Sequence, residues 1–164
     1  MELSPENDRK FGCILGAFVG DALGAYLEST KGKIEEEKVQ AAMSMTGGWY
    51  GQLCPGQLTD DSEMAMCLLR GLVEGNGQMD LNPICKYYGL WIHSNPIGSG
   101  RTTKACLQCI DPNNPDPRKP YEKTKKGFPA TSLSNGSMMR VTPLAVWCTK
   151  LSATEIEKAV TADA

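Results

Sequence analysis

The stretch LTDDSEM at residues 58–64 places one hydroxyl group and two adjacent carboxylates where a glycine-rich segment meets an apolar helical pattern. The segment before it, residues 46–57, contains too many glycines, together with a proline, to form regular secondary structure. After it, apolar side chains recur at helical spacing up to Leu72. The sequence therefore predicts a helix that begins near Thr59 and ends by Gly75.

The side chains of Thr59, Asp60 and Asp61 allow two interpretations. Hydroxyl and carboxylate oxygens are the ligands that Mg²⁺, Mn²⁺ and Ca²⁺ prefer, so the three residues are candidate ligands of a divalent cation. Alternatively, Thr59 is an ordinary N-cap, and acidic residues in a first turn are favoured by the helix dipole by about 0.3–1 kcal/mol each. Both interpretations stay open from these residues alone.

An earlier helix is predicted from the Ser4-Pro5 pair, an N-cap followed by proline at the first helical position. Apolar residues from Phe11 to Tyr26 recur at helical spacing and predict a broad buried stripe. Asp21 lies among them and is expected to be partly buried with polar partners. Glu28, seven residues later, falls on roughly the same face. A ridge of glycines at i, i+4 spacing also predicts close packing of another backbone. These glycines are Gly12, Gly16, Gly20 and Gly24.

Further helical patterns account for almost all remaining apolar residues, and no alternating run predicts a strand. These patterns begin at Asn82, Thr102, Met138 and Ser152. Pro143 is expected to kink one of them, and His93 is expected to lie at a helix C-terminus in a capping role. Residues 111–126 are expected to form a long surface loop. With the two earlier helices, the pattern predicts an all-α protein of five or six helices.

Length and composition predict one globular domain, residues 1–164. The formal net charge is −2, which gives no reason to expect a nucleic acid or a membrane as partner. No secretory signal or membrane-spanning run is recognisable, so a cytoplasmic location is expected. Seven cysteines, an odd number in mostly apolar surroundings, predict reduced and buried thiols, without a disulfide framework or a zinc site.

Three segments follow one another along the chain: GDALG at residues 20–24, TDDSEM at residues 59–64 and SNGSMMR at residues 134–140. In this order and at these separations they resemble the ADP-ribosylglycohydrolase family, which includes ADP-ribosylarginine hydrolases and the enzyme that reactivates dinitrogenase reductase. The resemblance runs from Phe11 to Ala164 and covers about the first half of a typical member. It implies an all-α orthogonal helical bundle of the ADP-ribosylglycohydrolase type. The chain ends inside a helical pattern, which predicts that the bundle is truncated.

The resemblance also implies a site for two Mg²⁺ or Mn²⁺ ions beside a cleft for ADP-ribose. By motif position, Thr59, Asp60 and Asp61 would be metal ligands. Glu28 would be a carboxylate near the metals that helps to position water or gates the cleft, and it joins Asp60 and Asp61 as a predicted catalytic residue. The implied reaction is attack of water at the anomeric carbon. Two turns would contact the ribose and the diphosphate, through Gly98, Gly100, Ser132, Ser134, Asn135 and Gly136.

The second acidic motif of the family, Asp-x-Asp followed by Thr or Ser, has no counterpart after Asp61. Three interpretations therefore stay open. The first is a metal-dependent hydrolase that acts on an ADP-ribosylated protein or a small ADP-ribosyl compound. The second is a catalytically impaired remnant that binds ADP-ribose, or that pairs with another chain or a second copy to cover the missing half. The third is a purely structural helical protein.

Overall fold

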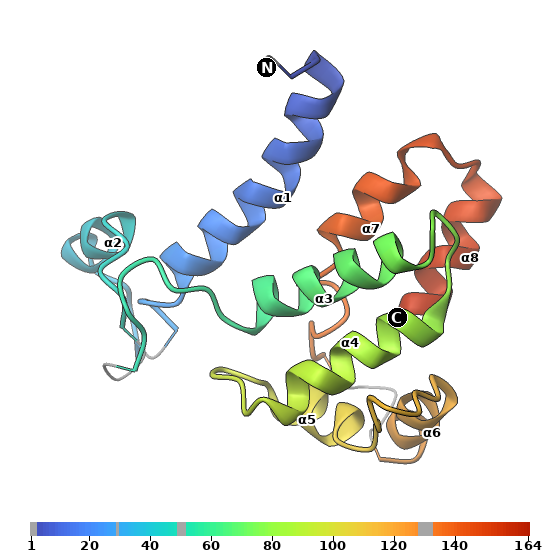
Figure 1. The fold of residues 1–164 in the computed structure, drawn as a ribbon. Coiled ribbons are helices and arrows are strands. Elements are labelled where there is room, and N and C mark those ends of the chain that lie inside the picture. Colours follow the sequence, from blue (N-terminus) through green and yellow to red (C-terminus); the bar gives the residue numbers. More distant parts are fainter. Residues whose placement is uncertain (1–2, 29, 49–51, 128–132) are drawn as a thin grey trace. The chain divides into compact units, whose positions relative to one another are not determined.

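The computed structural model describes residues 3–28, 30–48, 52–127 and 133–164 (Figure 1). Within these ranges the chain forms eight α-helices and one 3₁₀ helix, and an isolated bridge between Gly48 and Leu53 takes the place of any strand. The predicted all-α fold is therefore confirmed. The helices are α1 (Pro5–Gly24), α2 (Glu36–Met43), α3 (Asp60–Glu74), α4 (Leu81–His93), α5 (Arg101–Leu107), α6 (Arg118–Gly127), α7 (Thr142–Trp147), η1 (Cys148–Lys150) and α8 (Ala153–Asp163).

The chain divides into two compact units, Met1–Ser62 and Glu63–Ala164. Helix α3 begins in the first unit and continues into the second. The proposal of one domain over residues 1–164 stays a prediction. Among the described helices, none combines the length and the apolar character needed to cross a bilayer.

Helix α1 begins as the sequence predicts but does not bury the stripe expected of it. The Ser4 hydroxyl accepts a hydrogen bond from the Asn7 N–H at 3.3 Å, and proline follows in the first turn. Only Ala22 of this helix is buried, whereas Phe11 and Leu15 are more than half exposed. A Cβ added at any of the four ridge glycines would have no neighbour within 4 Å in the described part of the chain, so the close packing expected of this ridge is not found within the first unit. Periodicity identifies which side chains share a face, and it carries no information on whether that face is covered.

The second unit holds the hydrophobic core, to which α3, α4, α7 and α8 contribute. Leu68 and Leu144 are fully buried at its centre. Helices α3 and α4 approach so closely that a Cβ on Gly71 would come within 2.6 Å of the Ile84 Cα, and glycine is therefore required there. The buried members of this core are Met64, Cys67, Leu68, Leu72, Ile84, Cys85, Tyr88, Trp91, Ile92, Ile110, Leu144, Cys148 and Ala159.

Two expectations about irregular segments are wrong. Arg118–Gly127 is helix α6, because Asp116 accepts a hydrogen bond from the Arg118 N–H at 3.1 Å and caps the helix, and Pro120 falls in the first turn, where its missing N–H is tolerated. Pro143 lies in the first turn of α7, which begins at Thr142, and does not kink a longer helix. Residues 136–140, which precede α7, form turns, so the SNGSMMR segment contains no regular helix.

One local prediction is confirmed in full, and two hold in part. Ser152 and Glu155 form the capping box at the start of α8, with the Ser152 N–H donating to Glu155 Oε2 at 2.8 Å. His93 is the last residue of α4, as predicted, and its Nε2 lies 2.8 Å from the Ile110 carbonyl oxygen. Its predicted capping role is wrong, because the Ser94 hydroxyl donates to the Trp91 carbonyl oxygen in the last turn at 2.7 Å. All seven cysteines are free thiols, although Cys13 and Cys54 are exposed where burial was expected.

Candidate functional site

The start of α3 is held by Asp21 of α1. Asp21 Oδ2 accepts hydrogen bonds from the backbone N–H groups of Thr59 at 2.9 Å and Ser62 at 3.2 Å, and Asp21 Oδ1 accepts one from Thr59 Oγ1 at 2.5 Å. N–H groups at a helix start have no acceptor within the helix, and a carboxylate there is also favoured by the helix dipole. Asp21 therefore provides the cap that the sequence assigned to the Thr59 side chain, and the expected polar partners of Asp21 are these groups.

The contact with Asp21 also determines what the Thr59 hydroxyl can do. A hydroxyl has one proton and two lone pairs, and Thr59 directs its proton to Asp21. Its oxygen is then oriented to act as an acceptor or as a cation ligand, in the way that outer hydrogen bonds orient metal-binding groups. Thr59 is 5% exposed and the neighbouring Asp60 is 8% exposed, so both lie in a desolvated position.

Carboxylates gather beside this helix start. Partial burial, and then the charge of Asp21, raises the pKa of Asp61 above its ordinary 3.8. Partial burial, and then the charges of Asp61 and Asp21, raises the pKa of Glu28 above its ordinary 4.5. Glu28 as a whole residue is exposed, so water screens much of this repulsion. The like charges disfavour full ionisation, and a bound cation would offset their repulsion.

These residues fit a divalent cation by their chemistry and only partly by their arrangement. The donors are hard oxygens, and the buried Ser62 Oγ has no hydrogen-bond partner in the described part of the chain. However, no group of three or more His, Cys, Asp and Glu side chains within the described ranges is arranged to hold a metal ion. The positive end of the α3 dipole also opposes a cation, so the carboxylates must outweigh it. Thr59, Asp60 and Asp61 can therefore supply only part of a coordination shell.

The raised pKa values of Asp61 and Glu28 predict how the stability of the metal-free protein changes with pH. Because the folded state raises the pKa values of Asp61 and Glu28, it binds more protons than the unfolded chain at pH values just above 3.8 and 4.5. The contribution of these two groups to the free energy of unfolding should therefore fall as the pH rises through this range, whereas Glu74, Asp116 and Glu155, whose pKa values are lowered by hydrogen bonds, contribute in the opposite direction. The melting temperature of the wild type in EDTA, relative to that of Asp61→Asn, is therefore expected to fall as the pH rises. Parallel pH profiles for the two proteins would contradict the repulsion.

In the second unit, the two turns predicted to contact ADP-ribose meet at Thr103 of α5. Thr103 is 9% exposed. A Cβ added to Gly100 would lie 3.8 Å from Thr103 Oγ1, and one added to Gly136 would lie only 2.9 Å from it. Gly136 is therefore required by a close approach, and Gly98 is required by its positive φ of 85°. The structure brings both predicted turns against one side chain.

The turn at residues 134–136 presents polar side chains outward. Ser134 and Asn135 are exposed, and the Asn135 carbonyl accepts hydrogen bonds from the N–H groups of Met138 at 2.8 Å and Met139 at 3.0 Å. These bonds close the turn from within and leave the side chains available to a ligand. Ser132, the remaining predicted contact, lies outside the described residues.

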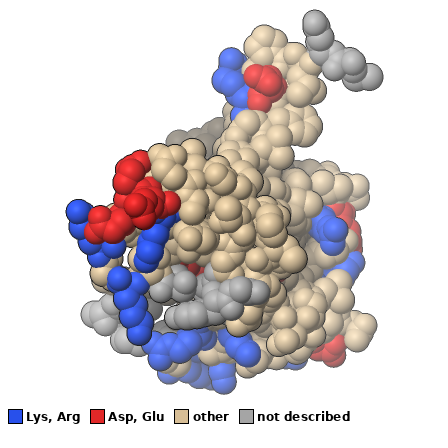
Figure 2. All heavy atoms as spheres, turned by 90° about the vertical axis from the view of Figure 1, so that its left-hand side faces the viewer, with Lys and Arg blue, Asp and Glu red and all other residues tan. Residues whose placement is uncertain are grey.

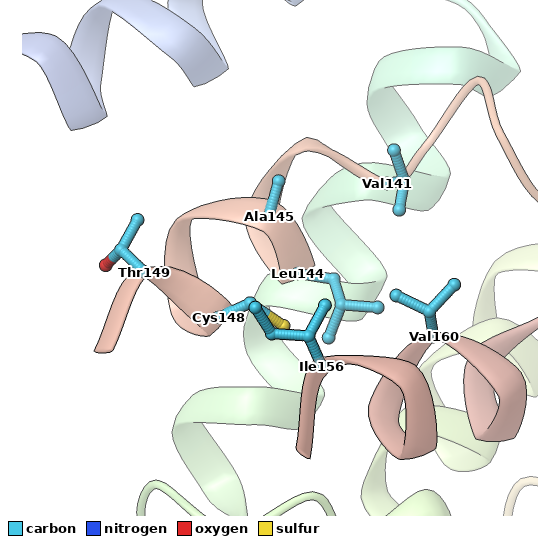
Figure 3. A pocket seen from close by; sticks show the side chains of 7 residues that line it. All are labelled: Val141, Leu144, Ala145, Cys148, Thr149, Ile156 and Val160. Carbon is cyan, nitrogen blue, oxygen red and sulfur yellow. The ribbon is translucent and has the colours of Figure 1, made fainter. Parts of the chain in front are cut away.

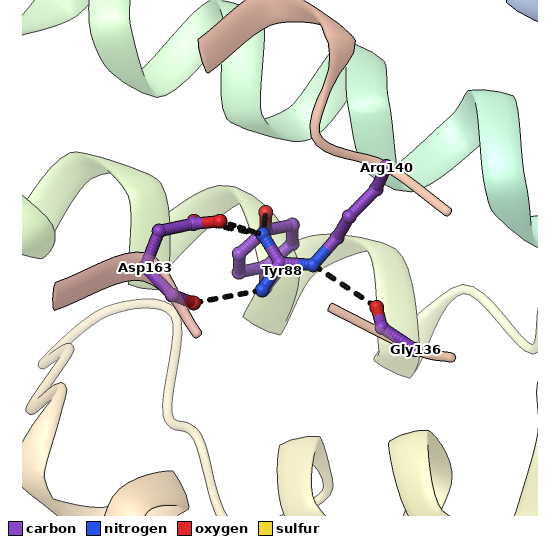
Figure 4. Close-up of polar contacts among 4 residues, drawn as sticks. All are labelled: Tyr88, Gly136, Arg140 and Asp163. Atoms are coloured by element: carbon purple, nitrogen blue, oxygen red, sulfur yellow. Dashed lines mark hydrogen bonds and ion pairs between the residues drawn. The ribbon is translucent and has the colours of Figure 1, made fainter. Parts of the chain in front are cut away.

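Arg140 lies behind this turn, 6% exposed (Figure 4). Its Nε donates to the Gly136 carbonyl oxygen at 3.3 Å, and its terminal nitrogens donate to both carboxylate oxygens of Asp163 at 2.8 and 3.0 Å and to the Asp163 carbonyl at 2.9 Å. A terminal nitrogen also donates to the Tyr88 hydroxyl, and the guanidinium carbon is 4.7 Å from the centre of the Tyr88 ring. The guanidinium thus joins α4, α8 and the turn.

Sequence reasoning did not identify Thr103, Tyr88 or Asp163 as neighbours of the predicted site. No local signal marks these residues. Tyr88 and Asp163, for example, contact Arg140 across 52 and 23 positions of sequence. Arg140 itself carried a signal, since it ends the SNGSMMR segment.

A pocket of about 300 Å³ lies between α7 and α8, and none of the predicted site residues is among the residues that line it (Figure 3). Its one polar side chain, Thr149, donates its hydroxyl to the Val146 carbonyl at 2.9 Å. An apolar lining offers nothing to a charged diphosphate. The lining residues are Val141, Leu144, Ala145, Cys148, Thr149, Ile156 and Val160.

Charged side chains on the face shown in Figure 2 occur in several separate groups, with uncharged residues over most of the surface between them. Helix α6 carries five Lys and Arg residues and one Glu. Lys126 of this helix approaches Glu122 at 3.8 Å. This pattern agrees with a solvated basic helix.

Comparisons with known proteins agree with this architecture. The family model for ADP-ribosylglycohydrolase matches residues 2–164. An ADP-ribosyl-[dinitrogen reductase] glycohydrolase of Rhodospirillum rubrum is 37% identical over 142 residues, which are 85% of this chain and 45% of the relative. The ADP-ribosylarginine hydrolase Tri1 of Pseudomonas putida (strain GB-1) is 29% identical over 157 residues, which are 88% of this chain and 38% of the relative.

A solved structure, an ADP-ribosylglycohydrolase-related protein complex, superposes with a TM-score of 0.67 at 28% identity and covers 99% of this chain and 50% of its own. The chain thus spans half or less of the length of the proteins that it matches. The family model covers nearly every residue, from before α1 to the end of α8. The chain therefore belongs to the ADP-ribosylglycohydrolase family.

Proposed function

We propose that this chain acts as a Mg²⁺- or Mn²⁺-dependent hydrolase that removes ADP-ribose from modified protein side chains. The observation that carries the proposal is the start of α3, where Asp21 orients the Thr59 hydroxyl beside Asp60 and Asp61. The names of the relatives, one acting on dinitrogen reductase and one on ADP-ribosylarginine, point to the same class of substrate.

In this proposal Thr59, Asp60 and Asp61 hold one side of a two-metal site, and Asp21 fixes the orientation of Thr59. Bound dications would orient the ribose hydroxyls and lower the pKa of an attacking water. Glu28, whose pKa is already raised, is suited to position that water and accept its proton. The exposed side chains of Ser134 and Asn135 would bind the ribose or the diphosphate.

A second candidate is an ADP-ribose-binding module without catalytic activity. It is favoured by the absence of a third suitably placed carboxylate among the described residues. In this case the turns around Thr103 would still bind ADP-ribose. A cytoplasmic location and self-association stay predictions in both cases.

The test is hydrolysis of ADP-ribosylarginine by the purified chain, followed as release of ADP-ribose. Release is expected to stop in EDTA and to return with added Mg²⁺ or Mn²⁺. Release that is indifferent to EDTA would contradict the metal assignment. Binding of ADP-ribose without release would favour the second candidate, and neither binding nor release would contradict both.

A further inference from the structure

The turn at residues 134–136 has an outer side that is exposed and an inner side that is bonded to the core. On the inner side, the Gly136 carbonyl accepts from Arg140 Nε, and the Gly136 Cα faces Thr103 closely enough to exclude a Cβ. Gly136 is thus held from two directions by buried side chains. Displacement of either side chain would move the exposed residues Ser134 and Asn135.

Burial of the Arg140 guanidinium costs desolvation free energy, so its buried position calls for an explanation. A buried ion pair such as Arg140 with Asp163 often contributes little net stability compared with apolar side chains of similar volume. What the guanidinium adds is geometry, because its N–H groups are planar and rigidly arranged. Asp163, in α8, accepts hydrogen bonds from the terminal nitrogens of Arg140, and the ring of Tyr88, in α4, packs against the guanidinium group. These contacts leave Nε directed at Gly136. Burial raises the pKa of Tyr88, so its hydroxyl stays neutral beside the cation.

We propose that Arg140 is a positioning residue for ADP-ribose, holding the 134–136 turn against Thr103 through its Nε–H bond to the Gly136 carbonyl. The inference rests on the proposed function in one respect, namely that this turn contacts ADP-ribose. It adds that Asp163, in the last turn of α8, determines the position of the 134–136 turn through its contact with Arg140. Arg140 itself does not touch the ligand in this assignment.

The test compares variants that remove different bonds of the same guanidinium. Arg140→Lys keeps a cation opposite Asp163 and removes the Nε–H donor to Gly136. Tyr88→Phe is the matched control, because it removes another hydrogen bond of Arg140 and leaves the Gly136 bond in place. The double variant Arg140→Met with Asp163→Leu replaces the ion pair by apolar groups without leaving an unpaired charge, in case the lysine variant does not fold.

Two measurements are made on each folded variant, at temperatures well below unfolding. One is the affinity for ADP-ribose by calorimetry in the presence of Mg²⁺, and the other is hydrogen exchange of the Met138 and Met139 amides that close the turn. Arg140→Lys and the double variant are expected to bind ADP-ribose about tenfold more weakly and to exchange these amides about tenfold faster. Tyr88→Phe is expected to lower the melting temperature and to leave both quantities within about twofold.

Unchanged affinity and unchanged exchange in folded Arg140→Lys would overturn the inference. If the wild-type chain does not bind ADP-ribose, the proposed function is contradicted instead. In that case the exchange rates alone decide about Arg140: faster exchange of the two amides supports the positioning role, and equal exchange overturns it.

Discussion

Asp60→Asn combined with Asp61→Asn is expected to abolish measurable Mg²⁺ binding and, with it, Mg²⁺-dependent release of ADP-ribose. A neutral amide oxygen attracts a dication much more weakly than a carboxylate, and both residues lie at the same helix start. Loss of two charged ligands should weaken binding at least about 100-fold, or roughly 2.7 kcal/mol. Calorimetric titration with MgCl₂ measures the change, and circular dichroism verifies that the helices persist.

The matched control is Glu36→Gln with Glu37→Gln. These two carboxylates lie in the first turn of α2, so the substitutions change the net charge equally and affect the same kind of helical position. The amide of residue 36 can still accept the hydrogen bond that Glu36 takes from Gln40 at 2.7 Å. This control is expected to bind Mg²⁺ like the wild type. Equal affinity in all three proteins would mean that Asp60 and Asp61 only stabilise the start of their helix.

Asp21→Ala is expected to lower the free energy of unfolding of the protein by about 3 kcal/mol. The substitution leaves three donors without their acceptor, namely the N–H groups of Thr59 and Ser62 and the Thr59 hydroxyl. Thr59 and Ser62 are buried, so water cannot easily replace the carboxylate. Asp21→Asn should cost less, about 1–2 kcal/mol, because one amide oxygen can still accept. Urea denaturation provides the measurement.

Asp8→Ala is the control for Asp21→Ala. Asp8 is another carboxylate of α1, in its exposed first turn, and its removal should change stability by less than about 1 kcal/mol. Equal destabilisation by the two substitutions would show that Asp21 acts only through its charge. A further consequence concerns the metal, because Asp21→Ala frees the Thr59 hydroxyl to rotate and should weaken Mg²⁺ binding about tenfold.

The elements that were predictable carry their signals within a few residues. Helix α8 has its capping box at Ser152 and Glu155, and α1 has Ser4 and Pro5. Capping and proline effects act over three or four positions, so local sequence is sufficient for them. Helix α6 was missed because its basic and proline-rich sequence has no apolar periodicity, whereas its cap is the side chain of Asp116.

Packing was not predictable in the same way. The apolar stripe of α1 shows a regular period, yet Phe11 and Leu15 are exposed. Gly71, which the sequence does not distinguish from the ridge glycines of α1, is the glycine against which a neighbouring helix packs. A repeat identifies a face, and only the position of another element determines whether the face is buried.

The sequence by itself determined the residue types of the candidate site, a hydroxyl and two carboxylates at a helix start and a glycine-containing polar turn, because ligand chemistry and turn chemistry belong to single residues and short motifs. Only the tertiary structure decided their partners. It assigned Asp21 as the cap that orients Thr59, Thr103 as the side chain on which both turns meet, and Arg140 with Asp163 as the support of Gly136. Asp21 with Thr59, Thr103 with Gly136, and Arg140 with Asp163 are 23 or more positions apart, and hydrogen-bond geometry at that range is a property of the packed fold.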